Sequence, residues 1–405
     1  MLTKLKQALK KYHKQVWVMY NQDNIDPYFC KYIAKNLSSG TLCFISPKVS
    51  YLLVHALDEA NLKKEIYNEE NVHIIVYRTV EELDALVEEV IAKLGFPEDI
   101  SLSYTTMGDN STDVIGHGKY VSLTKLLKKP YRTYSKKVKF SSAEEIMYDI
   151  ASQKTPLQIE RLKYMANITL TILEETISRI TIGMSEIAIV DLTLECMHEI
   201  MKKHIGTHGM VEYGVAWENC PIVLVGENLA KGGHSIPSNK MLQRGETIYF
   251  DYGIQVTFED GETLYTDMQR MGYVLQQDEK EAPKSVQKVF HTLVTSIEEG
   301  IEEMKPGVNA FKIDQIVRGM ILQEGYPDYN HATGHPVGED VHDMGAIISV
   351  KASRRARLPL VENGIYTLEP RVNIANGGSI EEMIQVTKYG GIPLCDTQKK
   401  LYYIK

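Results

Sequence analysis

Short apolar runs alternate with helical patterns over the first third of the chain. Four of these runs are rich in β-branched and aromatic residues, which is typical of strands, and they cover residues 16–20, 40–45, 51–54 and 72–77. Residues 80–94 place apolar side chains at helical spacing with acidic ones between them, and residues 1–18 interleave lysines with apolar positions as an amphipathic helix does. These elements predict an α/β domain over residues 1–150.

Longer helices and further strands are predicted after a basic and polar stretch at residues 135–145, which places a domain boundary near residue 150. Helices are expected from Pro156 onward and over residues 184–204 and 284–304. Strands are expected over residues 222–225, 247–258, 264–275, 346–350, 364–368 and 380–387. The chain is therefore predicted to be an α/β (α+β) protein with domains at residues 1–150 and 151–405.

Charge and cysteine content disfavour several classes of protein. Lysine and arginine number 45 against 53 aspartate and glutamate, so the net charge of −8 argues against a nucleic-acid-binding protein. The five cysteines are widely spaced without a CxxC pair, which disfavours a disulfide framework and a thiolate zinc site. The N-terminus lacks the apolar core of a signal peptide, and no apolar run reaches the roughly 18 residues of a membrane span. We expect a cytoplasmic protein without a nucleic-acid or membrane partner.

Three histidines, His331, His335 and His342, lie close together in the second predicted domain. The gap of four between the first two is that of a helical two-histidine zinc site. Pro336 argues against a helix, because it lacks an N–H and drives the preceding residue toward an extended conformation. The segment is therefore predicted to be a loop or strand. The histidines either fill a core or turn, or work with ligands from elsewhere in the chain.

A predicted hairpin supplies two carboxylates to accompany these histidines. Asp251 and Asp267 lie 16 positions apart on either side of a turn near Glu259, so they are expected to face each other on one side of the hairpin. Cross-strand Cβ atoms lie about 5 Å apart. Two carboxylates that close repel each other unless a proton or a cation lies between them, which favours a metal over two turn residues.

Two glutamates at strand ends complete the set of candidates. Glu369 ends one predicted strand and Glu381 opens another, although each alone is also typical of a surface or edge residue. Glu382 points to the opposite face from Glu381 and is expected at the surface. With His335, the two aspartates and two glutamates form an oxygen-rich set that suits Mn²⁺, Co²⁺, Fe²⁺ or Zn²⁺, and four carboxylates can hold two such ions.

Five short segments carry these candidates in a fixed order. They are Asp251-x-Gly253, Tyr265-Thr-Asp267-Met-x-Arg270, His331-x3-His335-x6-His342-Asp343, Glu369-Pro370 and Ile380-Glu381-x4-Val386-Thr387. Their order and spacing over residues 155–405 resemble the pita-bread metallopeptidases, which include aminopeptidase P, prolidase and methionine aminopeptidase. The first 150 residues resemble the creatinase-like N-terminal domain of the two-domain members. The resemblance implies a pita-bread catalytic domain over residues 151–405.

The resemblance also implies a site, position by position. It implies an exopeptidase that hydrolyses Xaa-Pro bonds of small peptides with two divalent ions, Mn²⁺ first and Co²⁺, Zn²⁺ or Fe²⁺ as alternatives, and that forms a homodimer. Asp267 and Glu381 would bridge both ions, and Glu369 would also act as general base. The implied metal ligands are Asp251, Asp267, His335, Glu369 and Glu381.

Three further histidines would serve the substrate in such an enzyme. His234 matches the family histidine that lines the substrate site, and His331 and His342 match those that hold the substrate and steady the tetrahedral intermediate. Of the three clustered histidines, the resemblance thus assigns one to metal and two to substrate.

Two departures from the family pattern leave alternatives open. The family's usual spacing of 11 after the first aspartate falls on Glu262, yet Asp267 fits the motif better and Glu262 sits beside the turn. Ser379 stands where many relatives carry an arginine, which puts strict Xaa-Pro specificity in doubt. One alternative is a pita-bread hydrolase or lyase that acts on a non-peptide C–N substrate. The other is a non-catalytic binding protein on the same fold, which the full ligand set disfavours.

Overall fold

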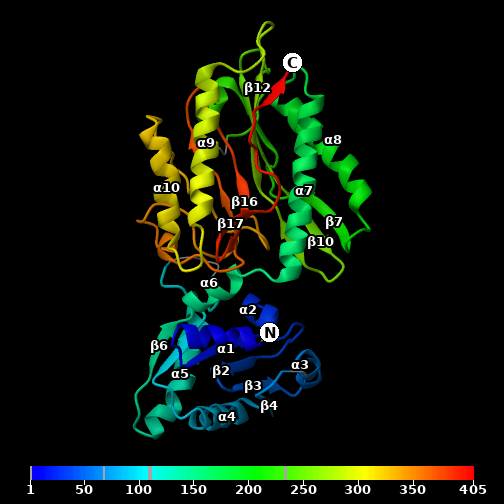
Figure 1. Cartoon of the computed structure of the whole chain (residues 1–405). Coiled ribbons are helices and arrows are strands. Elements are labelled where there is room, and N and C mark those ends of the chain that lie inside the picture. Colours follow the sequence, from blue (N-terminus) through cyan, green and yellow to red (C-terminus); the bar gives the residue numbers. More distant parts are fainter. Residues whose placement is uncertain (1, 67–68, 108–111, 232–234) are drawn as a thin grey trace. The chain divides into compact units, whose positions relative to one another are not determined.

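The computed structural model describes residues 2–66, 69–107, 112–231 and 235–405 (Figure 1). The chain divides into two compact units, Met1–Ala151 and Ser152–Lys405. None of the helices in this described part combines the length and apolar character that a membrane span requires.

The N-terminal unit is a mixed sheet with helices. Its strand order is β4-β3-β2-β1-β5-β6, in which β1, β2 and β3 pair antiparallel and the outer pairs are parallel. The strands are β1 (Val16–Asn21), β2 (Thr41–Ile45), β3 (Ser50–His55), β4 (Val72–Tyr77), β5 (Asp99–Leu102) and β6 (Lys139–Ser142). The helices are α1 (Leu2–Lys11), α2 (Pro27–Tyr32), α3 (Glu59–Glu65), α4 (Val80–Lys93), α5 (His117–Thr133) and α6 (Glu144–Ser152).

The elements predicted in this unit lie where the apolar pattern placed them. The four apolar runs form β1 to β4, and α4 begins at a Thr79 cap whose side chain accepts a hydrogen bond from the backbone N–H of Glu82. Helices α4 and α5 pack their apolar faces into the core of the sheet. The amphipathic helix at the N-terminus ends at Lys11, earlier than expected, because Val16 and the residues after it enter β1.

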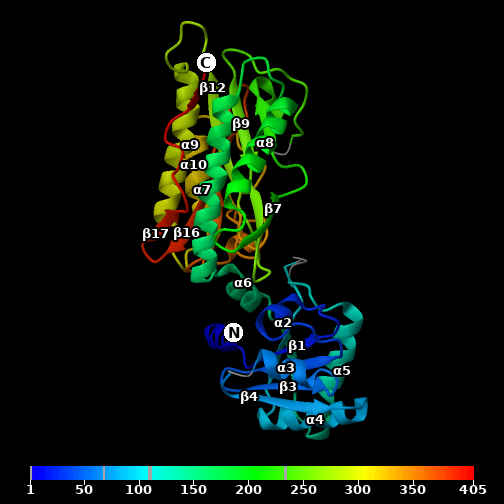
Figure 2. The same ribbon diagram turned by 90° about the vertical axis from the view of Figure 1, so that its right-hand side faces the viewer.

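Long helices cover one side of the strands in the C-terminal unit. Figures 1 and 2 show α7 and α9 on the same side of the strands, and α8 and α10 pack against them. Helix α7 starts at a capping box in which Thr155 and Gln158 exchange side-chain-to-backbone hydrogen bonds. The helices are α7 (Pro156–Arg179), α8 (Glu186–His204), α9 (Lys284–Glu303) and α10 (Ala310–Gln323), with short 3-10 helices η1 (Gly226–Lys231) and η2 (Arg355–Arg357).

The strands of this unit form several small sheets. Their orders are β18-β12-β9-β8, β11-β10-β7, β13-β16-β17 and β14-β15. The strands are β7 (Met210–Val215), β8 (Ile222–Val225), β9 (Thr247–Tyr252), β10 (Ile254–Phe258), β11 (Thr263–Tyr265), β12 (Met268–Val274), β13 (Ile365–Leu368), β14 (Arg371–Val372), β15 (Gly378–Ser379), β16 (Glu382–Thr387), β17 (Gly390–Pro393) and β18 (Tyr402–Ile404).

The predicted hairpin over residues 247–275 is broken in the middle of both arms. Each arm forms two strands, β9 and β10 on one side and β11 and β12 on the other, and the two pairs belong to different sheets. The break falls at Gly253, where a Cβ atom would lie only 1.9 Å from the carbonyl oxygen of Thr266. Glycine therefore permits the close backbone approach at which the hairpin changes sheets.

Residues 346–350 do not form the strand that their apolar pattern predicted. Ile348 makes a single bridge to Gly334, with N–H to carbonyl contacts of 2.9 and 3.1 Å. Ala346 and Ile348 are buried as loop residues, because they pack into the core beside α9 and α10 rather than into a ladder. This bridge secures the loop that carries the three histidines.

Candidate metal centre

The ends of several strands meet and bring the predicted carboxylates together. Asp251 lies in β9, Asp267 directly precedes β12, Glu369 follows β13 and Glu381 precedes β16. Asp251 pairs with Gln269 rather than with Asp267, so the predicted direct opposition of the two aspartates was wrong by two residues. The shift reflects the break at Gly253, and an even shift keeps both side chains on the same face.

His335 enters this group from an extended segment, as Pro336 led us to expect. Its backbone N–H donates to Thr367 Oγ1 at 3.1 Å, and its carbonyl accepts from the Thr367 N–H at 2.8 Å. Gly334 permits this close pairing with β13, because a Cβ there would lie 2.0 Å from the Thr367 carbonyl oxygen. The histidine is thereby held against the strand that ends at Glu369.

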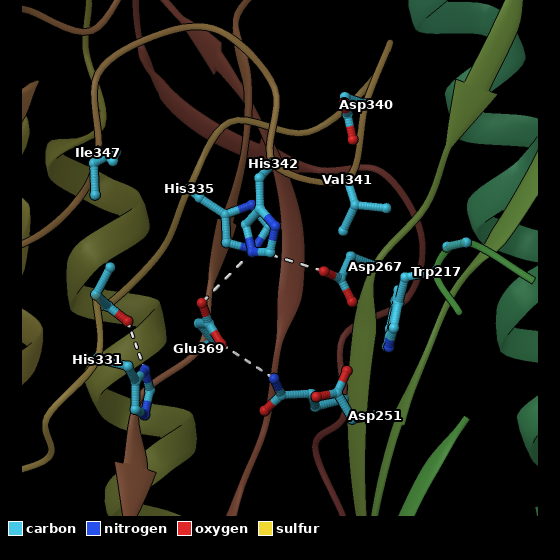
Figure 3. Close-up of a pocket in the computed structure, with 13 residues that line it drawn as sticks. Trp217, Asp251, Asp267, His331, His335, Asp340, Val341, His342, Ile347 and Glu369 are labelled. Atoms are coloured by element: carbon cyan, nitrogen blue, oxygen red, sulfur yellow. Dashed lines mark hydrogen bonds and ion pairs between the residues drawn. The ribbon is translucent and has the colours of Figure 1, made fainter. Parts of the chain in front are cut away.

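The imidazole of His335 presents a lone pair to three carboxylates. Its Nδ1 lies 3.1 Å from the Pro336 carbonyl, which can only accept, so Nδ1 carries the proton and Nε2 does not. Nε2 lies 3.6 Å from Asp267 Oδ2, 3.7 Å from Glu369 Oε1 and 3.9 Å from Glu381 Oε1. Figure 3 shows His335, Asp267 and Glu369 turned toward one another.

Burial shifts the pKa values in this cluster in the direction that favours the neutral form of each group. Burial, with repulsion from the neighbouring carboxylates, raises the pKa of Glu369 to about 8 and moves those of Asp267 and Glu381 well above the usual range. Burial also raises the pKa of Asp251 to about 6. The pKa of His335 falls to about 3, chiefly because burial disfavours the imidazolium, so its contacts with the carboxylates are not ion pairs.

Such a cluster fits a divalent cation. Neither oxygen of Glu381 nor Oδ1 of Asp267 receives a hydrogen bond from any residue that the structure describes. Asp267, His335 and Glu381 each offer one ligand atom, and these atoms lie within 4.8 Å of one another. Ligands that bind one ion at about 2.0–2.2 Å lie roughly 3–4 Å apart. A carbonyl on the far imidazole nitrogen is also the usual partner of a metal-bound histidine.

A buried arginine fixes the strand that carries Glu381. Arg270 is fully buried and donates to the Glu381 carbonyl at 2.9 Å and to Glu382 Oε2 at 3.1 Å. Glu382 is 2% exposed, so its predicted surface position was wrong. The alternation of side chains along the strand does place Glu382 on the opposite face from Glu381. That face is buried, however, and it contains Arg270, the ion-pair partner of Glu382.

A second buried arginine lies beside the carboxylates. Arg371 pairs across β14 and β15 with Ser379, and its guanidinium lies 4.7 Å from the ring centroid of Tyr249. The hydroxyl of Tyr249 donates to Asp251 Oδ2 at 2.9 Å, and the charge of Arg371 opposes the rise in the pKa of Asp251. A buried cation therefore lies directly opposite Ser379, on the strand with which that residue pairs.

The cluster opens into a cavity of about 460 Å³. His331 and His342 both line it, and the His342 ring lies 4.4 Å from that of His335. His234, the third histidine assigned to substrate, lies outside the described residues. The lining is Ala216, Trp217, Asp251, Asp267, Gln269, His331, Ala332, His335, Asp340, Val341, His342, Ile347 and Glu369.

Several residues at this site were not identified from the sequence. Gln269 occupied a variable position in the quoted motif, and Trp217 and Arg371 lay outside every motif. None of the three carried a clear signal in the sequence, although Arg371 directly follows the Glu369-Pro370 motif. Glu262, the alternative to Asp267, is an ion-pair partner of Arg161 at 2.7 Å and does not line the cavity.

Comparisons with known proteins identify the family of the chain. Residues 160–388 match the model of metallopeptidase family M24. An Xaa-Pro dipeptidase from Pyrococcus horikoshii is 29% identical over 171 residues, which are 42% of this chain and 44% of that protein. The match therefore spans less than half of the relative's length.

Two solved structures share the fold over nearly the whole chain. The X-Pro aminopeptidase from Thermotoga maritima aligns with a TM-score of 0.62 at 21% identity and covers 98% of this chain and 100% of its own. The prolidase from Pyrococcus horikoshii aligns with a TM-score of 0.60 at 21% identity over 99% of each chain. The predicted pita-bread fold is confirmed. Since the family model matches more than half of its residues, the chain belongs to metallopeptidase family M24.

Proposed function

We propose that the chain is an exopeptidase that hydrolyses Xaa-Pro peptide bonds with two divalent ions, Mn²⁺ first among them. The observation that carries the proposal is the neutral imidazole of His335, whose lone pair faces three buried carboxylates. Among the described residues, Asp267 and Glu381 leave oxygens without hydrogen-bond donors. Cations remove this repulsion and supply the missing partners.

We assign the metal ions to five side chains. Bound divalent ions would lower the pKa of a water molecule and polarise the scissile carbonyl. Asp267, Glu381 and His335 offer ligand atoms within 4.8 Å of one another, and we propose that the two carboxylates would be shared between the ions. The assigned ligands are Asp251, Asp267, His335, Glu369 and Glu381.

Glu369 is the proposed general base. Its Oε1 faces His335, and its Oε2 accepts a hydrogen bond from Gln269 Nε2 at 3.1 Å, so the carboxylate is held in the cavity wall. Burial that raises the pKa of Glu369 also strengthens it as a base toward water. In the proposed reaction it accepts a proton from the attacking water and delivers that proton to the leaving nitrogen of proline.

The cavity wall supports the choice of a small peptide. His331 and His342 line it on the side of the histidine loop and are the proposed contacts for the substrate carbonyl. Trp217, Val341 and Ile347 provide an apolar surface that suits a proline ring. The Xaa-Pro dipeptidase among the relatives supports the same substrate class.

The test is hydrolysis of matched peptides by metal-stripped protein before and after Mn²⁺ is restored. Ala-Pro, Ala-Pro-Ala and Ala-Ala form the smallest useful panel. We expect cleavage only with metal and only at Xaa-Pro, and the longer peptide separates an aminopeptidase from a dipeptidase. Metal-restored cleavage of Ala-Ala at an equal rate would refute the specificity, whereas metal binding without any cleavage would refute the activity.

A further inference from the structure

We infer that Gln269 is a positioning and specificity residue, in which the amide nitrogen holds Glu369 and the amide oxygen binds the free amino group of the substrate. This inference rests on the proposed peptidase function. Gln269 lines the cavity yet is only 4% exposed. Its backbone is fixed on two sides, by pairing with Asp251 and by contacts of 3.1 and 3.4 Å with Glu381.

The orientation of the Gln269 amide follows from its neighbour. Nε2 lies 3.1 Å from Glu369 Oε2, a contact marked by a dashed line at Glu369 in Figure 3. With the proposed cations bound, Glu369 would be ionised and could only accept hydrogen bonds, so the amide presents its nitrogen to Glu369 and turns its oxygen away. Within the described part of the chain, Oε1 is buried and receives no hydrogen bond.

A buried acceptor without a donor is costly, so this oxygen indicates a bound group with an N–H or O–H. The charge of Asp251 and Glu369 does not select the donor, because the proposed cations offset it. The number of donors does, because an amino group provides several N–H donors from one atom. The α-amino group of an unblocked peptide is the group of this kind that an exopeptidase must recognise.

The test compares peptides with and without this amino group. Ala-Pro-Ala is paired with propanoyl-Pro-Ala, in which hydrogen replaces the amino group, and the affinity of the second is taken as an inhibition constant if turnover is slow. Gln269→Met preserves the length of the side chain and removes its polar atoms. Gln385→Met is the matched control, because Gln385 is also a buried strand glutamine with an unbonded Oε1 among the described residues, but it does not line the cavity.

For Gln269→Met we expect the KM of Ala-Pro-Ala to rise by about 10- to 100-fold, the range for a hydrogen bond to a charged group, while the affinity for propanoyl-Pro-Ala stays unchanged. The kcat should fall for both peptides, because Glu369 loses its donor. Gln269→Glu keeps an acceptor and should retain the preference for the amino group while kcat falls. Bound metal per chain, measured by calorimetry, should equal that of the wild type in both variants.

Two results would overturn the inference alone. One is an equal loss of affinity for the two peptides in Gln269→Met, and the other is loss of metal from that variant, which would make Oε1 a metal ligand. A wild-type protein that cleaves neither Ala-Pro nor Ala-Pro-Ala would overturn the proposed function and this inference with it. If it cleaves only Ala-Pro, then Ala-Pro and propanoyl-Pro are the pair that is compared. The thermal unfolding of each variant identifies a folding defect, and Gln269→Glu then replaces Gln269→Met in the comparison.

Discussion

The carboxylate of Asp267 illustrates how the surroundings of a residue decide its role. Asp267 is buried beside other acids, and Oδ1 has no donor among the described residues. Its alternative, Glu262, is held by Arg161 through an ion pair at the side of the hairpin. The two acids therefore differ in what their removal does.

Asp267→Ala should abolish metal binding and peptide hydrolysis while the fold remains intact. The metal-free variant should be at least as stable as the metal-free wild type, because one repelling carboxylate has left the cluster. Calorimetric titration with Mn²⁺ and thermal unfolding measure both effects. Glu262→Ala is the control and should retain its metal, whereas the reverse pattern would show that Glu262 is the ligand.

Glu382→Gln should destabilise the protein by about 3 kcal/mol or more, because it leaves the charge of the fully buried Arg270 without its ion-pair partner. Urea unfolding of the metal-free protein measures the change. Glu302→Gln, at an exposed position of α9, should change stability by less than about 0.5 kcal/mol. Similar values for the two variants would contradict the proposed structural role of the Arg270 pair.

At the scale of elements, apolar patterning predicted the strands and long helices well, because a buried face leaves a period in the sequence. It failed where close backbone contacts decide the structure. The register around Asp251 depends on the approach of Gly253 to Thr266, which no period records. The order of the motifs predicted the metal centre, because four of its proposed ligands line one cavity and Glu381 lies close to two of them. Gln269 and Arg371 could not be predicted, because their roles depend on neighbours that only the fold brings close.

Gly253→Ala should destabilise the protein by about 3 kcal/mol or more and weaken metal binding, because the added methyl overlaps the Thr266 carbonyl at the point that sets Asp251 against β12. Gly319→Ala is the matched control in α10, where a Cβ meets no atom within 4 Å, and it should stabilise by about 0.5–1 kcal/mol. Thermal unfolding and Mn²⁺ titration provide the readouts. An unchanged metal affinity in Gly253→Ala would show that the break in the hairpin does not determine the geometry of the metal site.

At the scale of the C-terminal unit, the metal centre lies where two hydrophobic cores meet. Phe250 and Met268 flank the aspartates and belong to the core of α7 and α8. Leu368 and Ile380 flank the glutamates and belong to the core of α9 and α10. Repulsion within the cluster therefore acts on the packing of both halves, and stability should depend on pH and metal.

The melting temperature of metal-free protein should fall as pH rises from about 6.5 to 8.5. Glu369, Asp267 and Glu381 have raised pKa values, so the folded state binds more protons than the unfolded state here, and stability declines with pH. His335 acts in the opposite sense, but only below about 6.5, because its pKa is lowered. Mn²⁺ should remove most of the decline. A melting temperature that is independent of pH and of Mn²⁺ would contradict this balance.

The most direct test of the central claim is a titration of metal-stripped protein with Mn²⁺, in which bound metal and Ala-Pro cleavage are followed in the same samples. The account predicts no cleavage without metal, cleavage that rises with bound metal, and saturation at two ions per chain. Cleavage by metal-stripped protein would contradict the metal mechanism. Saturation with metal and no cleavage of any Xaa-Pro peptide would leave a metal-binding protein of the same fold with a different substrate.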